Sequence, residues 1–133
     1  MKSKEVHLKS RPSGMPVKDN FNVVEVDIPD PGPDQVLIQN IYMSVDPYMR
    51  GRMRFDFQPG AVLAGGALGK VVASNHSGFK AGDYVSHGQG WREYLLSDGR
   101  GLGKVDRSLA PLSAYLGVMG MPGLTAYGGL LVT

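Results

Sequence analysis

Two residues that could act on a substrate lie close together, beside two arginines, in the motif Asp46, Tyr48, Arg50 and Arg52. The phenol of Tyr48 is a natural hydrogen-bond donor to a substrate oxygen, and the alternative is a half-buried ring that packs beside Pro47. Asp46 is a poor general acid, because nearby positive charge favours its ionised form. We expect Asp46 to cap the turn that begins at Pro47 or to accept a bond from Arg50.

Metal and phosphate sites are weakly supported by the sequence. The absence of Cys excludes disulfides and thiolate-bound zinc. His7, His76 and His87 lack paired ligand spacing, so we expect surface or hydrogen-bonded histidines and no metal ligand. The Gly-rich stretches 60–66 and 99–103 do not lie between a buried strand and a helix, as pyrophosphate binding requires. We interpret both stretches as turns.

The composition indicates one soluble domain. The chain has 133 residues, and 14 basic and 12 acidic side chains leave a formal net charge of +2. This balance disfavours nucleic acid as a partner. No stretch has the length and apolarity of a signal peptide or a membrane span, so we expect a cytoplasmic protein without a membrane partner.

The pattern of elements predicts a mainly β fold with short helices. With 19 Gly and 9 Pro, the chain favours short strands joined by turns. We predict a surface loop over 50–60 because that segment has no clean period. We predict a curled sheet or barrel, with strands over 21–28, 35–43, 68–74, 84–87 and 91–96 and helical segments over 111–116 and 123–131.

Two motifs, MSVDPYMRGRM at 43–53 and GVMGMPGLTAY at 117–127, resemble a known family. It is the zinc-independent branch of the medium-chain dehydrogenases/reductases that contains prostaglandin/leukotriene, curcumin and alkenal double-bond reductases. Segments 14–17 and 79–85 extend the resemblance along the chain, although the second is common to the whole superfamily.

The resemblance implies a domain organisation. Residues 1–116 would form a GroES-like, partly open β-barrel on the substrate side. Residues 117–133 would form a junction helix that leads into an NADP-binding Rossmann domain, which is absent from this chain. The chain would then be an N-terminal fragment.

The resemblance also implies that no zinc is bound. Zinc-dependent members bind the metal with a Cys that lies three residues before an Asp. A second ligand lies in a separate Gly-His-Glu motif. Here Met43 precedes Asp46 by three residues, and Gly66 and Ala67 stand where the His and Glu would be. Plant relatives often carry a tyrosine at the position of Gly66, so one aromatic wall of their pocket is expected to be missing here.

Four site residues follow from the resemblance. Tyr48 would lie near the substrate carbonyl and orient it. Thr125 and Met121 would line the nicotinamide carboxamide pocket, with ordinary helix packing as the alternative. For Asp46 we favour a structural role over a cofactor contact.

The implied function of the whole protein is NADPH-dependent reduction of the C=C bond of an α,β-unsaturated ketone or aldehyde, with a homodimer as the expected assembly. The fragment alone should be inactive, because the pyrophosphate site belongs to the absent domain. The alternatives are a free-standing GroES-like binding or oligomerisation module and a quinone reductase of the same architecture. Arg50, Arg52 and Arg54 would meet cofactor phosphates or an acidic substrate tail, or form a solvated rim.

Overall fold

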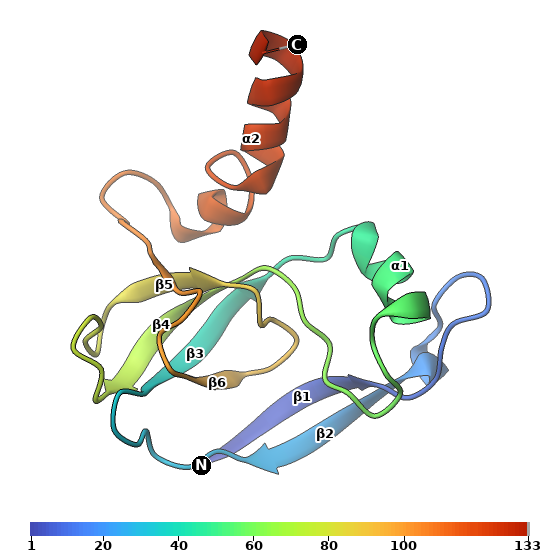
Figure 1. Cartoon of the computed structure of the whole chain (residues 1–133), viewed down its shortest axis with the longest axis horizontal. Coiled ribbons are helices and arrows are strands. Elements are labelled where there is room, and N and C mark those ends of the chain that lie inside the picture. The colour runs from blue at the N-terminus through green and yellow to red at the C-terminus, as the bar shows by residue number, and fades with distance from the viewer. Residues whose placement is uncertain (133) are drawn as a thin grey trace.

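A computed structural model describes residues 1–132 of the chain. The central element is a five-stranded antiparallel sheet with the strand order β6-β3-β4-β5-β7 (Figure 1). Its strands are β3 (Val36–Met43), β4 (Ala67–Ser74), β5 (Tyr84–His87), β6 (Tyr94–Ser97) and β7 (Gly103–Lys104). The strands predicted over 35–43, 68–74 and 84–87 are confirmed.

A second, two-stranded antiparallel sheet is formed by β1 (Lys2–Leu8) and β2 (Phe21–Asp27). The strand predicted over 21–28 is confirmed as β2. The sequence pattern does not predict β1, because two of its inward residues are Ser3 and Glu5, which break the apolar alternation expected of a half-buried strand. Isolated bridges from Glu5 to Arg92 and from His7 to Val62 attach this sheet to the rest of the chain, and the two sheets do not close into one barrel.

Three apolar clusters form the core. The first lies under α1 (Tyr48–Phe55), the second is formed by side chains of the five-stranded sheet, and the third includes a residue of the 3₁₀ helix η2 (Leu112–Leu116). Their buried members are Leu8, Met49, Met53, Phe57 and Leu63 in the first, Val36, Ile38, Val71, Val85 and Leu95 in the second, and Leu68, Val105 and Leu112 in the third.

The prediction of a surface loop over 50–60 is wrong for its first half, which belongs to helix α1. The helix buries only Met49 and Met53, one turn apart, and the arginines between and around them remain polar. Two apolar residues at i and i+4 in eight residues make a weak periodic signal, although they are enough to fix which face packs on the core.

The strand predicted over 91–96 begins later than expected, at Tyr94. Trp91 has a φ of 64°, in the left-handed region and outside the dihedral range of a regular strand. The backbone therefore turns sharply before β6 starts.

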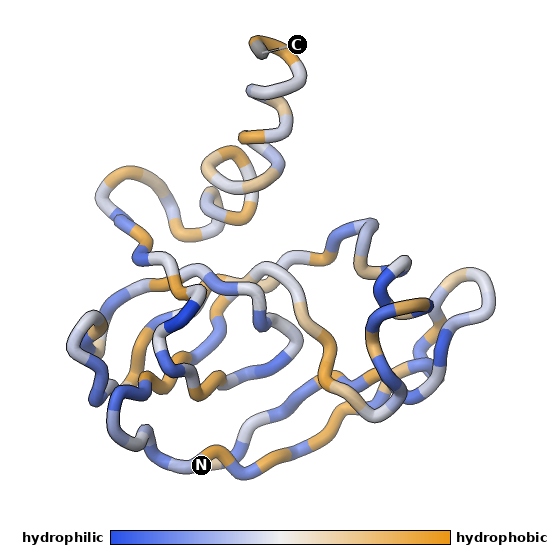
Figure 2. The backbone as a smooth tube through the Cα atoms, in the orientation of Figure 1, coloured by the Kyte–Doolittle hydropathy of each residue, from blue (hydrophilic) through white to orange (hydrophobic). Residues whose placement is uncertain are grey.

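The helical predictions over 111–116 and 123–131 are confirmed by η2 and by α2 (Met121–Tyr127), which continues as the π-type turn η3 (Gly128–Val132). α2 projects away from both sheets (Figure 1). Figure 2 shows apolar positions along this projecting segment, and Leu124 and Leu130 are among its exposed apolar side chains. Within residues 1–132, no helix has the length and apolarity needed to span a bilayer. Thr133, the end of the predicted junction helix, lies outside the described residues.

Candidate functional site

A small cavity, here called the junction pocket, lies where the end of β3, the start of α1 and the start of α2 meet. Its volume is about 130 Å³. Three of the four predicted site residues line it, namely Asp46, Tyr48 and Met121. The other lining residues are Ser44, Gly66, Tyr115, Leu116 and Pro122.

Tyr48 is held at the mouth of this pocket by the packing of α1. Its neighbour Met49 is buried at 2% exposure in the first core cluster, which fixes the rotation of the helix. Tyr48 therefore falls on the open side, with 43% of its surface exposed. No hydrogen bond from its hydroxyl to the described residues is present, so the phenol is available to a ligand in the pocket.

The carboxylate of Asp46 is hydrogen-bonded within the chain, but to neither of the two predicted partners. Its carboxylate accepts a hydrogen bond from the hydroxyl of Ser44 at 2.5 Å, and α1 begins without a side-chain cap. Its backbone carbonyl accepts the N–H of Met49 at 3.0 Å. Ser44 in turn donates its N–H to the carbonyl of Gly66 at 2.7 Å. This chain of bonds joins the end of β3 to the start of α1 and shapes one wall of the junction pocket.

Met121 and Thr125 occupy successive turns of α2. Met121 lines the junction pocket, whereas Thr125 lies one turn further along and does not line it. The hydroxyl of Thr125 donates to the carbonyl of Met121 at 2.8 Å. Its oxygen lone pairs are left to accept a bond from an amide donor.

A larger cavity, here called the apolar cavity, lies on the other side of Asp46 and has a volume of about 420 Å³. Asp46 lines both spaces, so they meet at this residue. The walls of the apolar cavity are Met15, Pro16, Phe21, Val45, Pro47, Met49, Arg50, Met53 and Trp91. The sequence reasoning did not identify this cavity. Met49 and Met53, spaced one turn apart beside Tyr48, were the signal that could have pointed to it.

Gly65 allows the walls of the apolar cavity to pack closely. A Cβ at Gly65 would lie 2.2 Å from Cε of Met49 and 3.5 Å from Nε1 of Trp91. The neighbouring Gly66 is less restricted, since a Cβ there would make ordinary contacts with Leu116 and Ser44. Gly65 therefore packs against the walls of the apolar cavity, whereas Gly66 lines the junction pocket.

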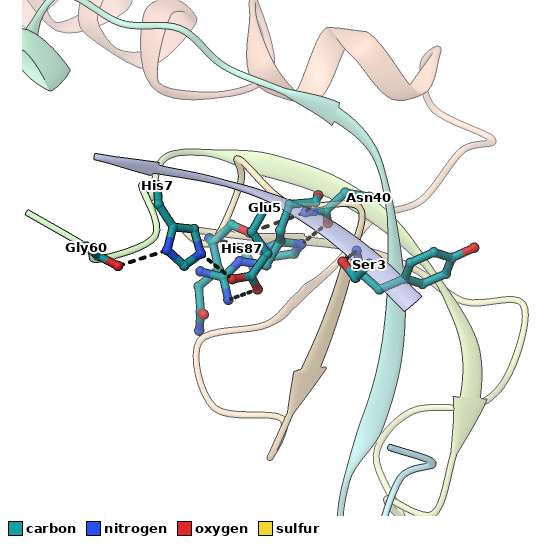
Figure 3. Close-up of polar contacts among 9 residues, drawn as sticks. Ser3, Glu5, His7, Asn40, Gly60 and His87 are labelled. Carbon is teal, nitrogen blue, oxygen red and sulfur yellow. Dashed lines mark hydrogen bonds and ion pairs between the residues drawn. The ribbon is translucent and has the colours of Figure 1, made fainter. Parts of the chain in front are cut away.

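Polar side chains on β1, β3 and β5, among them Glu5, Asn40 and His87, form hydrogen-bonded groups (Figure 3). Glu5 forms ion pairs with His7 at 2.8 Å and with Arg92 at 3.6 Å. His87 is hydrogen-bonded to Asn40 at 2.8 Å. Burial, assisted by the positive charge of Arg92, lowers the pKa of His87 to about 4, so this imidazole is neutral at pH 7.

The three arginines of α1 have different roles. Arg52 pairs with Asp56 at 3.3 Å and stacks over the ring of Phe57 at 4.6 Å, which makes it a structural residue. Arg50 lines the apolar cavity. The backbone carbonyl of Arg54 accepts a bond from Arg11.

The described residues contain no group of three or more His, Asp or Glu side chains that could hold a metal ion. The Gly-rich stretches also lack the context of a pyrophosphate site. Residues 60–66 run from α1 toward β4, and residues 99–101 form a turn before β7. Neither stretch leads from a strand into a helix.

Comparison with known proteins agrees with this geometry. Residues 4–105 match the family described as the N-terminal domain of oxidoreductase. The chain belongs to this family. The resemblance to curcumin and alkenal double-bond reductases is confirmed by two relatives. The NADPH-dependent curcumin reductase of Escherichia coli is 46% identical over 130 residues, and the NADP-dependent 2-alkenal reductase of Nicotiana tabacum is 36% identical over 139 residues.

The family fold is confirmed by a solved structure. The crystal structure of CurA from Vibrio vulnificus in complex with NADPH aligns over 97% of this chain with a TM-score of 0.88 and 40% identity. The chain is thus a GroES-like, mainly β N-terminal domain with unclosed sheets. It spans 40% of that CurA chain, and 38% and 40% of the lengths of the curcumin and alkenal reductases.

Proposed function

We propose that this chain forms the substrate-side wall of an NADPH-dependent reductase that acts on the C=C bond of α,β-unsaturated ketones and aldehydes. The observation that carries the proposal is the meeting of two cavities at Asp46. One contains a free phenol, and the other is lined mainly by apolar side chains. A polar reacting group joined to an apolar body has the shape and polarity to occupy both.

Tyr48 is proposed to donate a hydrogen bond from its hydroxyl to the substrate carbonyl oxygen. This oxygen gains negative charge as the double bond is reduced, and a donor placed beforehand stabilises that charge. NADPH, when bound, supplies the hydride for the β-carbon, and a proton from solvent or another donor completes the saturated product. The NADPH in the Vibrio vulnificus CurA structure supports the same cofactor for this chain.

The residues that would face the nicotinamide end are Met121 and Thr125. Met121 offers an apolar surface in the junction pocket, and the Thr125 oxygen can accept a bond from a carboxamide N–H. The fit is partial, because neither Gly-rich stretch has the strand-to-helix context of a pyrophosphate site. We therefore propose that 1–116 is the substrate-side domain and that 117–133 leads into a Rossmann domain that holds the rest of the cofactor.

The apolar cavity is proposed to receive the carbon chain or ring attached to the enone. Half of its lining residues are methionine or aromatic, and the three methionines can adapt to different apolar shapes. Arg50 supplies a positive charge among these walls, so an acidic group on the substrate can be paired there.

The test is an assay of the protein together with whatever follows Thr133 in its reading frame. We expect NADPH oxidation, followed at 340 nm, in the presence of an aliphatic enone, with the saturated ketone as the product by mass spectrometry. An allylic alcohol as product would contradict the proposal. Turnover of quinones without enones would favour the quinone reductase, and no turnover of either would favour the binding module.

A further inference from the structure

Trp91 is the point where the backbone around the apolar cavity is most constrained. Its φ of 64° lies in the left-handed region, which is unfavourable for a bulky aromatic residue. Such a conformation persists only where the surrounding contacts determine it. The neighbouring Gly90 N–H donates to Gly65 at 2.8 Å, and the carbonyl of Trp91 accepts the N–H of Val6 at 2.8 Å.

Asn40 is the side chain that spans this constrained residue. Its amide nitrogen donates to the carbonyl of Gln89 at 3.3 Å and to the carbonyl of Arg92 at 2.9 Å. One acceptor precedes Trp91 in the chain and the other follows it. Asn40 belongs to β3, and its backbone N–H donates to the carbonyl of Glu93 at 2.8 Å. Its side-chain amide is therefore held by a hydrogen-bonded strand.

His87 fixes the orientation of the Asn40 amide (Figure 3). The Nδ1 atom of His87 accepts the backbone N–H of Gln89 at 3.1 Å. Nε2 therefore carries the proton and donates to Oδ1 of Asn40 at 2.8 Å. With its oxygen held by His87, Asn40 must direct its two N–H groups toward the Trp91 loop.

We propose that Asn40, oriented by His87, is a positioning residue that holds Trp91 in the wall of the apolar cavity and thereby sets which substrate shapes the cavity accepts. The inference rests on the proposed function for its second half, the effect on substrate shape. The first half, the position of Trp91, stands on the geometry alone.

Loss of the Asn40 amide removes the donor from the exposed Gln89 carbonyl and from the part-buried Arg92 carbonyl, and it releases the backbone on both sides of Trp91. The residue then relaxes toward a more favourable φ, and its indole leaves the wall between Met49 and Gly65. Tyr48 is on the open side of α1, so the chemistry at the carbonyl should be affected less than the binding of the apolar part of the substrate.

The 133-residue chain has a single tryptophan, so its fluorescence reports on Trp91 directly. We would compare acrylamide quenching in the wild type, N40L and N40A, with circular dichroism to confirm that each variant is folded. N75L is the matched control, because the Asn75 amide also donates to two loop carbonyls, at Pro31 and Gly32. We expect the quenching constant to rise roughly two-fold in the Asn40 variants and to stay unchanged in N75L.

A second pair of variants tests His87. The amide of H87Q can both donate to Asn40 and accept from Gln89, so it should keep quenching close to that of the wild type, whereas H87L should shift it in the direction of N40L. If N40L does not fold, N40A and the His87 pair decide the question. Wild-type quenching in a folded Asn40 variant, or an equal change in N75L, would overturn the proposal.

The role in substrate shape is tested in the active protein. We expect N40L to raise KM for enones with bulky apolar chains roughly ten-fold, with a smaller change in kcat and little change for short enals. Altered quenching with unchanged KM for every enone would overturn the link to substrate shape. If the wild type reduces no enone at all, the proposed function fails, while the fluorescence comparison still decides whether Asn40 positions Trp91.

Discussion

Gly123 in the first turn of α2 packs directly on the backbone carbonyl of Val118. A Cβ at Gly123 would lie 1.7 Å from that oxygen, a distance that the backbone can relieve only by moving. The turn before α2 therefore requires glycine at position 123, and so does the position of Met121 in the junction pocket.

G123A should destabilise the start of α2 by about 1–3 kcal/mol, because the added methyl group forces a backbone shift. Faster hydrogen exchange of the α2 amides would reveal the change. G128A is the control, since Gly128 has helical dihedral angles and no atom within 4 Å of an added Cβ. Equal exchange in G123A and the wild type would show that the turn tolerates the methyl group.

Y48F should lower kcat/KM for enones roughly 100-fold, because it removes a donor to the developing oxyanion and leaves the ring in place. Steady-state assays at 340 nm measure the loss. Y42F makes the same chemical change at a tyrosine that lines neither the junction pocket nor the apolar cavity, and its activity should match the wild type. A Y48F enzyme with full activity would show that the phenol does not act on the carbonyl.

G66A should be tolerated, because a Cβ at Gly66 would make contacts of 3.5 and 3.6 Å, within the ordinary range. G66Y should fill much of the junction pocket, whose volume is about 130 Å³. We expect KM for branched enones to rise roughly ten-fold in G66Y, and that for small enals to change less. The ratio of the two KM values in G66Y and G66A is the measurement.

The stability of the chain should fall between pH 6.5 and pH 4 through His87. The folded-state pKa is lowered to about 4, and the ordinary value is 6.5. The unfolded chain therefore takes up the proton first as the pH falls, so the contribution of neutral His87 is complete above pH 6.5 and lost on the way to pH 4. The total is about 3 kcal/mol.

Urea unfolding of the wild type and H87Q at pH 7, 5.5 and 4 tests this loss. The difference in unfolding free energy between the two proteins should shrink as the pH falls. The carboxylates of Asp83, Asp98 and Asp106, whose pKa values are lowered by hydrogen bonds, add their own loss only at more acid pH. A parallel pH profile in H87Q would assign the effect to other groups.

Much of the sheet could be predicted from sequence because its strands alternate or concentrate β-branched residues, as in β3. Strand β1 could not be predicted, because its buried residues include Ser3 and Glu5. Their polar groups are satisfied by Tyr94 and Arg92, which lie far away in the sequence. α1 was missed for a related reason. Its apolar face consists of two methionines, and the contacts of its arginines with Asp56, Phe57 and Arg11 form only in the folded chain.

The site shows the same division. The motifs indicate four site residues, of which Asp46, Tyr48 and Met121 line one pocket and Thr125 does not. The apolar cavity was not foreseen, because Phe21 and Trp91 reach it from segments seventy residues apart in sequence. The left-handed backbone of Trp91 also leaves no trace in a pattern of hydrophobic residues.

The two cavities that meet at Asp46 are built from parts of the chain that differ in how readily their sequence can change. On one side, Tyr48 and Asp46 stand on the rigid junction between β3 and α1. On the other, Met15 and Pro16 contribute from the connection between the two strands of the small sheet, where Met15 is 71% exposed. Surface connections accept substitutions and insertions readily. In the proposed reductase, new substrate ranges can therefore evolve by changes in that connection while Tyr48 and Asp46 stay the same.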